Sequence, residues 1–222
     1  GDLMIVSASR RTDIPSYYSE WLVNRLKEKY VLVRNPMNIH QVSKIDLSSD
    51  VVDAIVFWTK NPTPMLSYLD QIEDYTYYFQ FTLSAYGPDV ERNLPSKNKI
   101  IIPTFQQLSK EIGKEKVIWR YDPIFFNEQY SIEYHCKYFE VLASKLGDYT
   151  EKCTVSFMDM YRNTERNVKS LSIVKDTYEI QVELLQRFVE IAKEYGLYID
   201  ICAEIGDFHK IGVEHAHCID RE

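Results

Sequence analysis

The chain has 222 residues, of which 45% are hydrophobic, and it carries a formal net charge of −7 with a pI near 5.3. This length and apolar content allow one domain with a sizeable core. The negative charge argues against a broad surface for nucleic acid or for an anionic membrane. No apolar run approaches the roughly 18 residues of a membrane span, and the N-terminus lacks a signal-peptide pattern, so we expect a cytoplasmic protein.

Strand-like apolar runs alternate with helical patterns along the chain. The runs lie at residues 3–9, 30–34, 54–59, 77–83, 117–121, 153–158 and 197–204. Most are nearly continuous, as in strands that are covered on both faces. Between the runs, the periodicity predicts helices at residues 16–29, 63–73, 104–113, 131–146 and 176–195. The polar, proline-broken intervals 35–53 and 84–103 are interpreted as excursions above the strands.

This alternation predicts an α/β fold built of βαβ units with parallel strands. About seven strands in one domain of this size favour a TIM-like (β/α) barrel, incomplete or permuted because it is one strand short. An open doubly wound sheet is the alternative. The expected organisation is therefore a single barrel-like domain over residues 1–222.

Charged residues follow several of the predicted strands. In a parallel α/β fold the carboxyl ends of the strands form the functional face, so these residues converge on one rim. Arginine binds carboxylate or phosphate through two parallel hydrogen bonds, which predicts a site for a small anionic ligand. The alternative is a set of ion pairs with neighbouring aspartates that closes the end of the barrel. The candidate residues are Arg10, Arg11, Asp13, Arg34, Lys60, Arg120, Asp122, Asp159 and Glu204.

The C-terminal segment CAEIGDFHKIGVEHAHCID contains a second group of candidate ligands. Cys202, His217 and Cys218 offer the thiolate and imidazole groups that bind zinc, iron or an iron–sulfur cluster. Their spacing matches no compact zinc motif, and packed cysteines with solvated histidines are the alternative interpretation.

Several longer motifs resemble one bacterial family. They are SASRRTDIP (7–15), VLVRNP (31–36), VFWTKNP (56–62), YYFQFTL (77–83), VIWRYDPI (117–124), CAE (202–204) and HCID (217–220). Assembled in this order, they resemble the family catalogued as domain of unknown function 1848 over nearly the whole chain.

That resemblance implies more than the residues themselves. Family members continue into a cysteine-rich tail with Cys-x-x-x-Cys-x-x-Cys, which is similar to the cluster-binding signature of radical S-adenosylmethionine enzymes. The family therefore resembles a permuted radical barrel with a [4Fe–4S] cluster and S-adenosylmethionine as cofactors, and Cys202 and Cys218 could join an auxiliary cluster. This sequence ends at Glu222 without the triad, so we expect it to be truncated before the tail and to bind no radical cluster as it stands.

Two other functions fit the same residues. The first is a metal-dependent barrel hydrolase or isomerase, in which Asp13, Asp122, Asp159, Glu204 and either His40 or His217 bind a divalent ion that activates water. The second is a non-catalytic module that binds an anion or nucleotide through the same rim. The sequence leaves these alternatives open.

Overall fold

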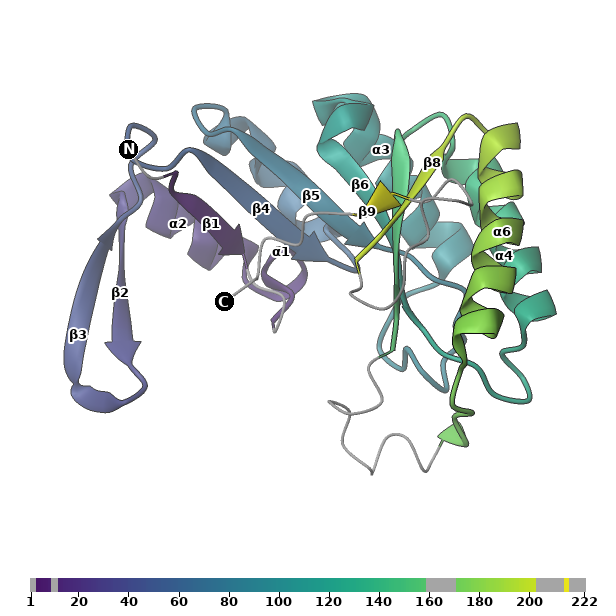
Figure 1. The fold of residues 1–222 in the computed structure, drawn as a ribbon. Helices are drawn as coiled ribbons and strands as arrows, with labels where there is room; N and C mark the ends of the chain where they lie inside the picture. The colour runs from purple at the N-terminus through teal and green to yellow at the C-terminus, as the bar shows by residue number, and fades with distance from the viewer. Residues whose placement is uncertain (1–2, 9–11, 159–170, 203–213, 216–222) are drawn as a thin grey trace. The chain divides into compact units, whose positions relative to one another are not determined.

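A computed structural model describes residues 3–8, 12–158, 171–202 and 214–215 of the chain. These residues belong to two compact units, Gly1–Phe81 and Thr82–Glu222 (Figure 1). Each unit contains parallel strands and the helices that follow them, and each is described by itself.

The first unit is built on three parallel strands in the order β1 (Ile5–Ala8), β4 (Ala54–Thr59) and β5 (Tyr77–Thr82). All three were predicted as strands. Phe57 pairs in register with Phe79, and their ring centroids are 4.8 Å apart in a core without solvent exposure. The described helices of this unit are α1 (Ile14–Tyr17), α2 (Ser19–Glu28) and the 3-10 helix η1 (Thr63–Ile72).

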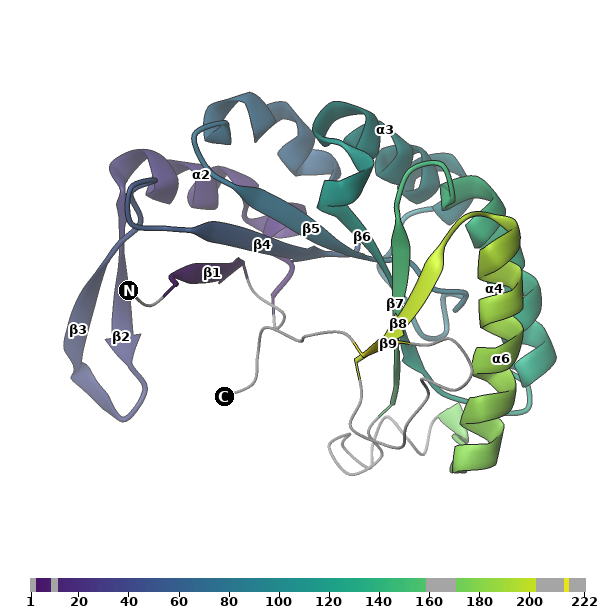
Figure 2. The same cartoon turned by 45° about the horizontal axis from the view of Figure 1, so that its top comes forward.

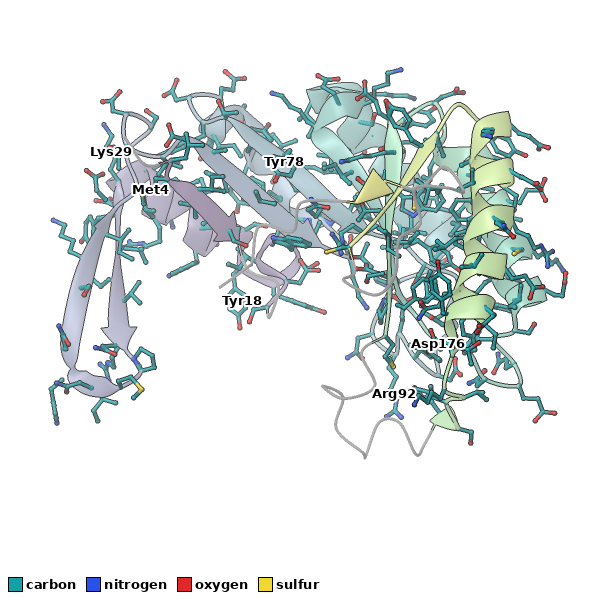
Figure 3. All side chains as sticks on the ribbon, in the orientation of Figure 1. Met4, Tyr18, Lys29, Tyr78, Arg92 and Asp176 are labelled. Carbon is teal, nitrogen blue, oxygen red and sulfur yellow. The ribbon has the colours of Figure 1, made fainter. Side chains whose placement is uncertain are left out.

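The segment after α2 differs from the prediction. Strand β2 (Tyr30–Asn35) was expected to be a parallel barrel strand, but it pairs antiparallel with β3 (Asn38–Asp46). Only two residues connect the strands, whereas a parallel crossover requires a dozen or more. The interval interpreted as an irregular excursion is therefore the second strand of a hairpin, whose side chains project on both sides of the ribbon (Figure 3).

The second unit contains the strands β6 (Val117–Ile124), β7 (Lys152–Phe157), β8 (Tyr198–Ile201) and the short β9 (Glu214–His215), in this order. Each described pairing from β6 to β9 is parallel. The helices are η2 (Lys97–Ile101), α3 (Ile102–Ile112), η3 (Lys114–Lys116), α4 (Ile132–Leu146) and α6 (Tyr178–Glu194). The predicted helices at 131–146 and 176–195 are confirmed, and each begins after a hydroxyl cap, Ser131 or Thr177.

Aromatic side chains join strand β6 of the second unit to the helices of that unit. Trp119 and Tyr121 on β6 are fully buried and contact Phe139 of α4. Phe139 in turn stacks on Phe188 of α6 with the ring centroids 4.0 Å apart. Figure 2 shows α4 and α6 side by side along one face of β6, β7 and β8. Because side chains alternate along a strand, residues Arg120 and Asp122 lie on the opposite face.

The predicted α/β class with parallel strands is confirmed, with β1, β4 and β5 parallel in one unit and β6, β7 and β8 parallel in the other. The TIM-like barrel, incomplete or permuted, and the single domain remain predictions. Among the helices that the structure describes, none combines the length and the apolar character needed to cross a membrane.

Candidate functional site

The sheet face of the second unit that lies opposite α4 and α6 is polar. Register places three residues side by side across β6, β7 and β8, namely Arg120, Thr154 and Asp200. Their exposed fractions are 2%, 2% and 8%, so all three are buried. We call these three residues the polar row.

One ion pair connects the polar row to the carboxyl end of β6. Arg120 donates to Asp122 Oδ2 from Nε at 3.1 Å and from Nη2 at 2.7 Å. Ser156 of the neighbouring strand β7 donates to the same oxygen at 3.2 Å. The alternative interpretation of the sequence, an ion pair between Arg120 and Asp122, is therefore what the structure shows for these two residues.

A second ion pair lies on the same face. Lys152 Nζ is 3.0 Å from Asp200 Oδ2, and the lysine side chain is 37% exposed while the aspartate side chain is 11% exposed. The other carboxylate oxygen, Oδ1 of Asp200, is buried and accepts no hydrogen bond from the described residues. A buried carboxylate oxygen without a donor is costly, and such atoms are uncommon in folded proteins.

Among the residues that the structure describes, the two ion pairs of this face balance in charge. Arg120 and Lys152 contribute two positive charges, and Asp122 and Asp200 contribute two negative charges. Divalent metal ions prefer sites with an excess of oxygen ligands and of negative charge. The two cations within the ion pairs oppose such an ion, so this face suits an organic ligand better than a bare metal.

Tyrosine hydroxyl groups hold the chain immediately after Asp122. Tyr86 donates to Pro123 O at 2.6 Å and accepts from Phe125 N at 3.0 Å. Its ring stacks on Phe125 with centroids 4.5 Å apart. Burial raises the pKa of the Tyr86 hydroxyl far above its usual value, so the hydroxyl stays protonated as the first hydrogen bond requires. This contact fixes the backbone that follows the ion pair.

A buried histidine continues this support. His135 has no exposed surface, and its Nε2 lies 2.8 Å from Phe125 O. A carbonyl oxygen only accepts, so Nε2 carries the proton and Nδ1 accepts from Tyr121 Oη at 2.7 Å. Burial lowers the pKa of His135 to about 4, which keeps the ring neutral at neutral pH.

The described candidates of the first unit have structural partners or lie in the hairpin. Asp13 accepts from Ser16 N at 3.0 Å, from Thr59 Oγ1 at 2.7 Å and from Lys60 N at 2.7 Å. These contacts cap α1 and attach it to the end of β4. Arg34 is exposed on β2, so its predicted place at the end of a parallel strand was wrong.

Several predicted residues lie outside the described part of the chain: Arg10, Arg11, Asp159, Glu204, His217 and Cys218. Cys202 is described and lies directly after β8, where its backbone N–H donates to Val155 O at 2.9 Å. His40, a candidate of the metal-dependent alternative, is exposed on β3. The metal and anion sites that involve the undescribed residues remain predictions.

The buried thiols of Cys136 and Cys153 are poorly suited to bind a cluster. Burial raises the pKa of Cys136 to about 11 and that of Cys153 well above its usual value. Metals bind thiolates, which such values disfavour. The described residues hold no group of three or more His, Cys, Asp or Glu side chains arranged to bind a metal ion. These described residues do not fit a [4Fe–4S] cluster.

The sequence interpretation missed four residues on the polar face: Lys152, Thr154, Ser156 and Asp200. A signal was present, because polar residues occupy every second position of KCTVSF and a charged residue interrupts YIDI. Such alternation indicates a strand with one apolar face and one polar face. Both segments had been interpreted as nearly continuous apolar runs.

Comparison with known proteins gives a family but no activity. No functionally curated protein matches the chain. A crystal structure of a "putative alpha-L-fucosidase" from Bacteroides thetaiotaomicron VPI-5482 aligns with 90% of this chain and 73% of that chain, at 9% identity and a TM-score of 0.38. The family described as "Domain of unknown function (DUF1848)" matches residues 5–222, and the chain belongs to this family.

Proposed function

We propose that the chain is the small-molecule-binding α/β part of an enzyme and that its ligand binds at the carboxyl ends of β6 and β7. One observation carries this proposal: the side chains of the Arg120–Asp122 pair are only 3% and 14% exposed, and Asp122 lies in the C-terminal half of β6, toward the end at which parallel α/β proteins place their sites. A buried ion pair contributes little net stability compared with apolar residues of similar volume. A role in ligand binding is a better reason for such a pair than a role in folding.

The ligand class follows from the cations at this position. Arg120 lies in the polar row, and Lys152 is the more exposed cation on the same face. A carboxylate or phosphate group is the expected partner of these side chains. We therefore propose a small molecule with an anionic group.

The reaction we propose for the intact enzyme is that of a radical S-adenosylmethionine enzyme with a barrel fold. The basis is the resemblance of the family's cysteine-rich tail to the cluster-binding signature of such enzymes, since the 222 residues themselves contain no Cys-x-x-x-Cys-x-x-Cys sequence. The role proposed for Arg120 and Asp122 is to bind and orient the substrate, whichever segment supplies the thiolates that hold the cluster.

The test uses a form of the protein that extends beyond residue 222 and includes the cysteine triad. Anaerobic iron reconstitution is expected to give a brown protein that cleaves S-adenosylmethionine. Asp122→Asn should lower the turnover of S-adenosylmethionine while the cluster absorbance stays unchanged. Asp148→Asn, at an exposed turn, is the matched control. A colourless and inert product would contradict the radical reaction, whereas equal turnover in both variants would contradict the proposed binding site.

A further inference from the structure

We propose that Thr154 and Asp200 form a subsite that accepts hydrogen bonds from the ligand, so that the ligand is a small acid carrying an ammonium or hydroxyl group. This inference rests on the proposed function, because it specifies the ligand of the same site. It goes further by naming the group that the ligand must carry beside its anionic group.

The starting observation is Oδ1 of Asp200. The residue is 8% exposed, and Oδ1 is buried and accepts no hydrogen bond from the part of the chain that the structure describes, although Oδ2 of the same carboxylate pairs with Lys152. Leaving a buried carboxylate oxygen unpaired costs free energy, which a donor from a bound molecule would recover. The missing partner is a donor, because an ionised carboxylate can only accept hydrogen bonds.

The neighbours of Asp200 define where this donor lies. Thr154 is the register partner of Asp200 on β7, and Arg120 is the register partner of Thr154 on β6. Adjacent strands lie about 4.8 Å apart, so the backbones of β6 and β8 lie about 10 Å apart at this row. A ligand over this row would meet acceptor oxygens at Asp200 and Thr154 and a cation at Arg120.

This arrangement favours one class of small molecule. An α-amino acid or α-hydroxy acid carries both a donor and a carboxylate, so one molecule can offer a donor to Asp200 and Thr154 and a carboxylate to Arg120. The balanced charges of the two ion pairs also favour a ligand of low net charge in a buried site. A simple anion would use the cations and leave Asp200 Oδ1 unpaired.

Four small probes separate these requirements. Glycine carries an ammonium donor and a carboxylate, glycolate carries a hydroxyl donor and a carboxylate, acetate has the carboxylate alone, and glycine betaine has both charges but no N–H donor. Each would be titrated into the 222-residue protein while the backbone amide resonances of β6, β7 and β8 are followed by NMR. We expect glycine or glycolate to bind at least about tenfold more tightly than acetate and betaine, since a hydrogen bond to a charged group is lost with the latter two.

Variants assign the difference to the subsite. Asp200→Asn and Thr154→Val are expected to remove the preference of the protein for donor-bearing probes, and Asp148→Asn to preserve it. Thr154→Val keeps the shape and charge of the row, so it remains informative if Asp200→Asn does not fold.

The outcomes distinguish the two proposals. If acetate or betaine shifts the same resonances as strongly as glycine and glycolate, the subsite is refuted while an anion site remains supported. If none of the four probes shifts resonances of these strands, the subsite and the anionic ligand class are both refuted. A preference that survives in both row variants would also overturn the assignment to Thr154 and Asp200.

Discussion

Replacing Arg120 by methionine tests whether the Arg120–Asp122 pair is energetically coupled. Methionine keeps an apolar stem of similar length but removes the guanidinium, so that, among the described residues, the Asp122 carboxylate retains the 3.2 Å contact from Ser156. Removing one partner of a buried ion pair costs about 3–5 kcal/mol. The Asp122 side chain is 14% exposed and is partly hydrated, so we expect the lower end of this range, about 3 kcal/mol.

Urea unfolding provides the measurement. Trp119 is fully buried beside Arg120 in β6 and is one of three tryptophans, so fluorescence combined with circular dichroism reports unfolding of the whole chain, this unit included. For a chain of this size, a loss of about 3 kcal/mol corresponds to a decrease in Tm of about 6–12 °C. Because the pair is nearly buried, the loss should change little between low and moderate salt concentrations.

A double-variant cycle measures the coupling energy between Arg120 and Asp122 directly. Asp122→Leu alone leaves the guanidinium without its carboxylate, whereas the double variant Arg120→Met/Asp122→Leu removes both charges. We expect the double variant to be more stable than the sum of the single losses predicts. An Arg120→Met loss below about 0.5 kcal/mol, or strict additivity of the two variants, would refute the assigned coupling.

Three further predictions concern residues that support the fold. The pKa of His135 is about 4 in the folded protein and near 6.5 in the unfolded chain, so the contribution of this residue to the free energy of unfolding should be fully present above pH 6.5 and should fall by up to about 3 kcal/mol as the pH decreases to 4. His135→Gln, followed by urea unfolding across this range, should flatten this pH dependence, and an unchanged slope would contradict the assignment. Tyr86→Phe removes the hydroxyl that contacts Phe125 N and should lower the free energy of unfolding in urea by about 1–3 kcal/mol. The control Tyr138→Phe, at an exposed position, should lower it far less, and equal losses would refute this role for the Tyr86 hydroxyl. Asp13→Ala removes the cap of α1 and should lower the free energy of unfolding of the first unit by about 1–2 kcal/mol, measured by hydrogen exchange; unchanged protection of α1 amides would count against the capping contact.

Much of the secondary structure was predictable from local patterns. Strand β4 agrees with the apolar run at 54–59, and α4 and α6 agree with amphipathic periods that begin after a hydroxyl residue. The hairpin was not recognised, because β2 has the same apolar composition as the parallel strands. Strand direction depends on where the next strand pairs, and a run of apolar residues does not carry that information.

The candidate site was predicted in part. Arg120 and Asp122 were identified because charged residues within an otherwise apolar strand contrast with their neighbours. Thr154 and Asp200 were missed, since each lies inside a strand and becomes notable only when register places it beside Arg120.

The sequence by itself determined the α/β class, the charged endings of the strands and the family motifs, because these depend on residue type and local spacing. Only the tertiary structure decided which charges are paired and which carboxylate oxygen is left without a donor. Pairing across β6, β7 and β8 joins residues separated by some 80 positions of the chain, and burial then determines the energetic consequence of each contact. Asp200 is an ordinary aspartate in the sequence and a buried acceptor in the fold.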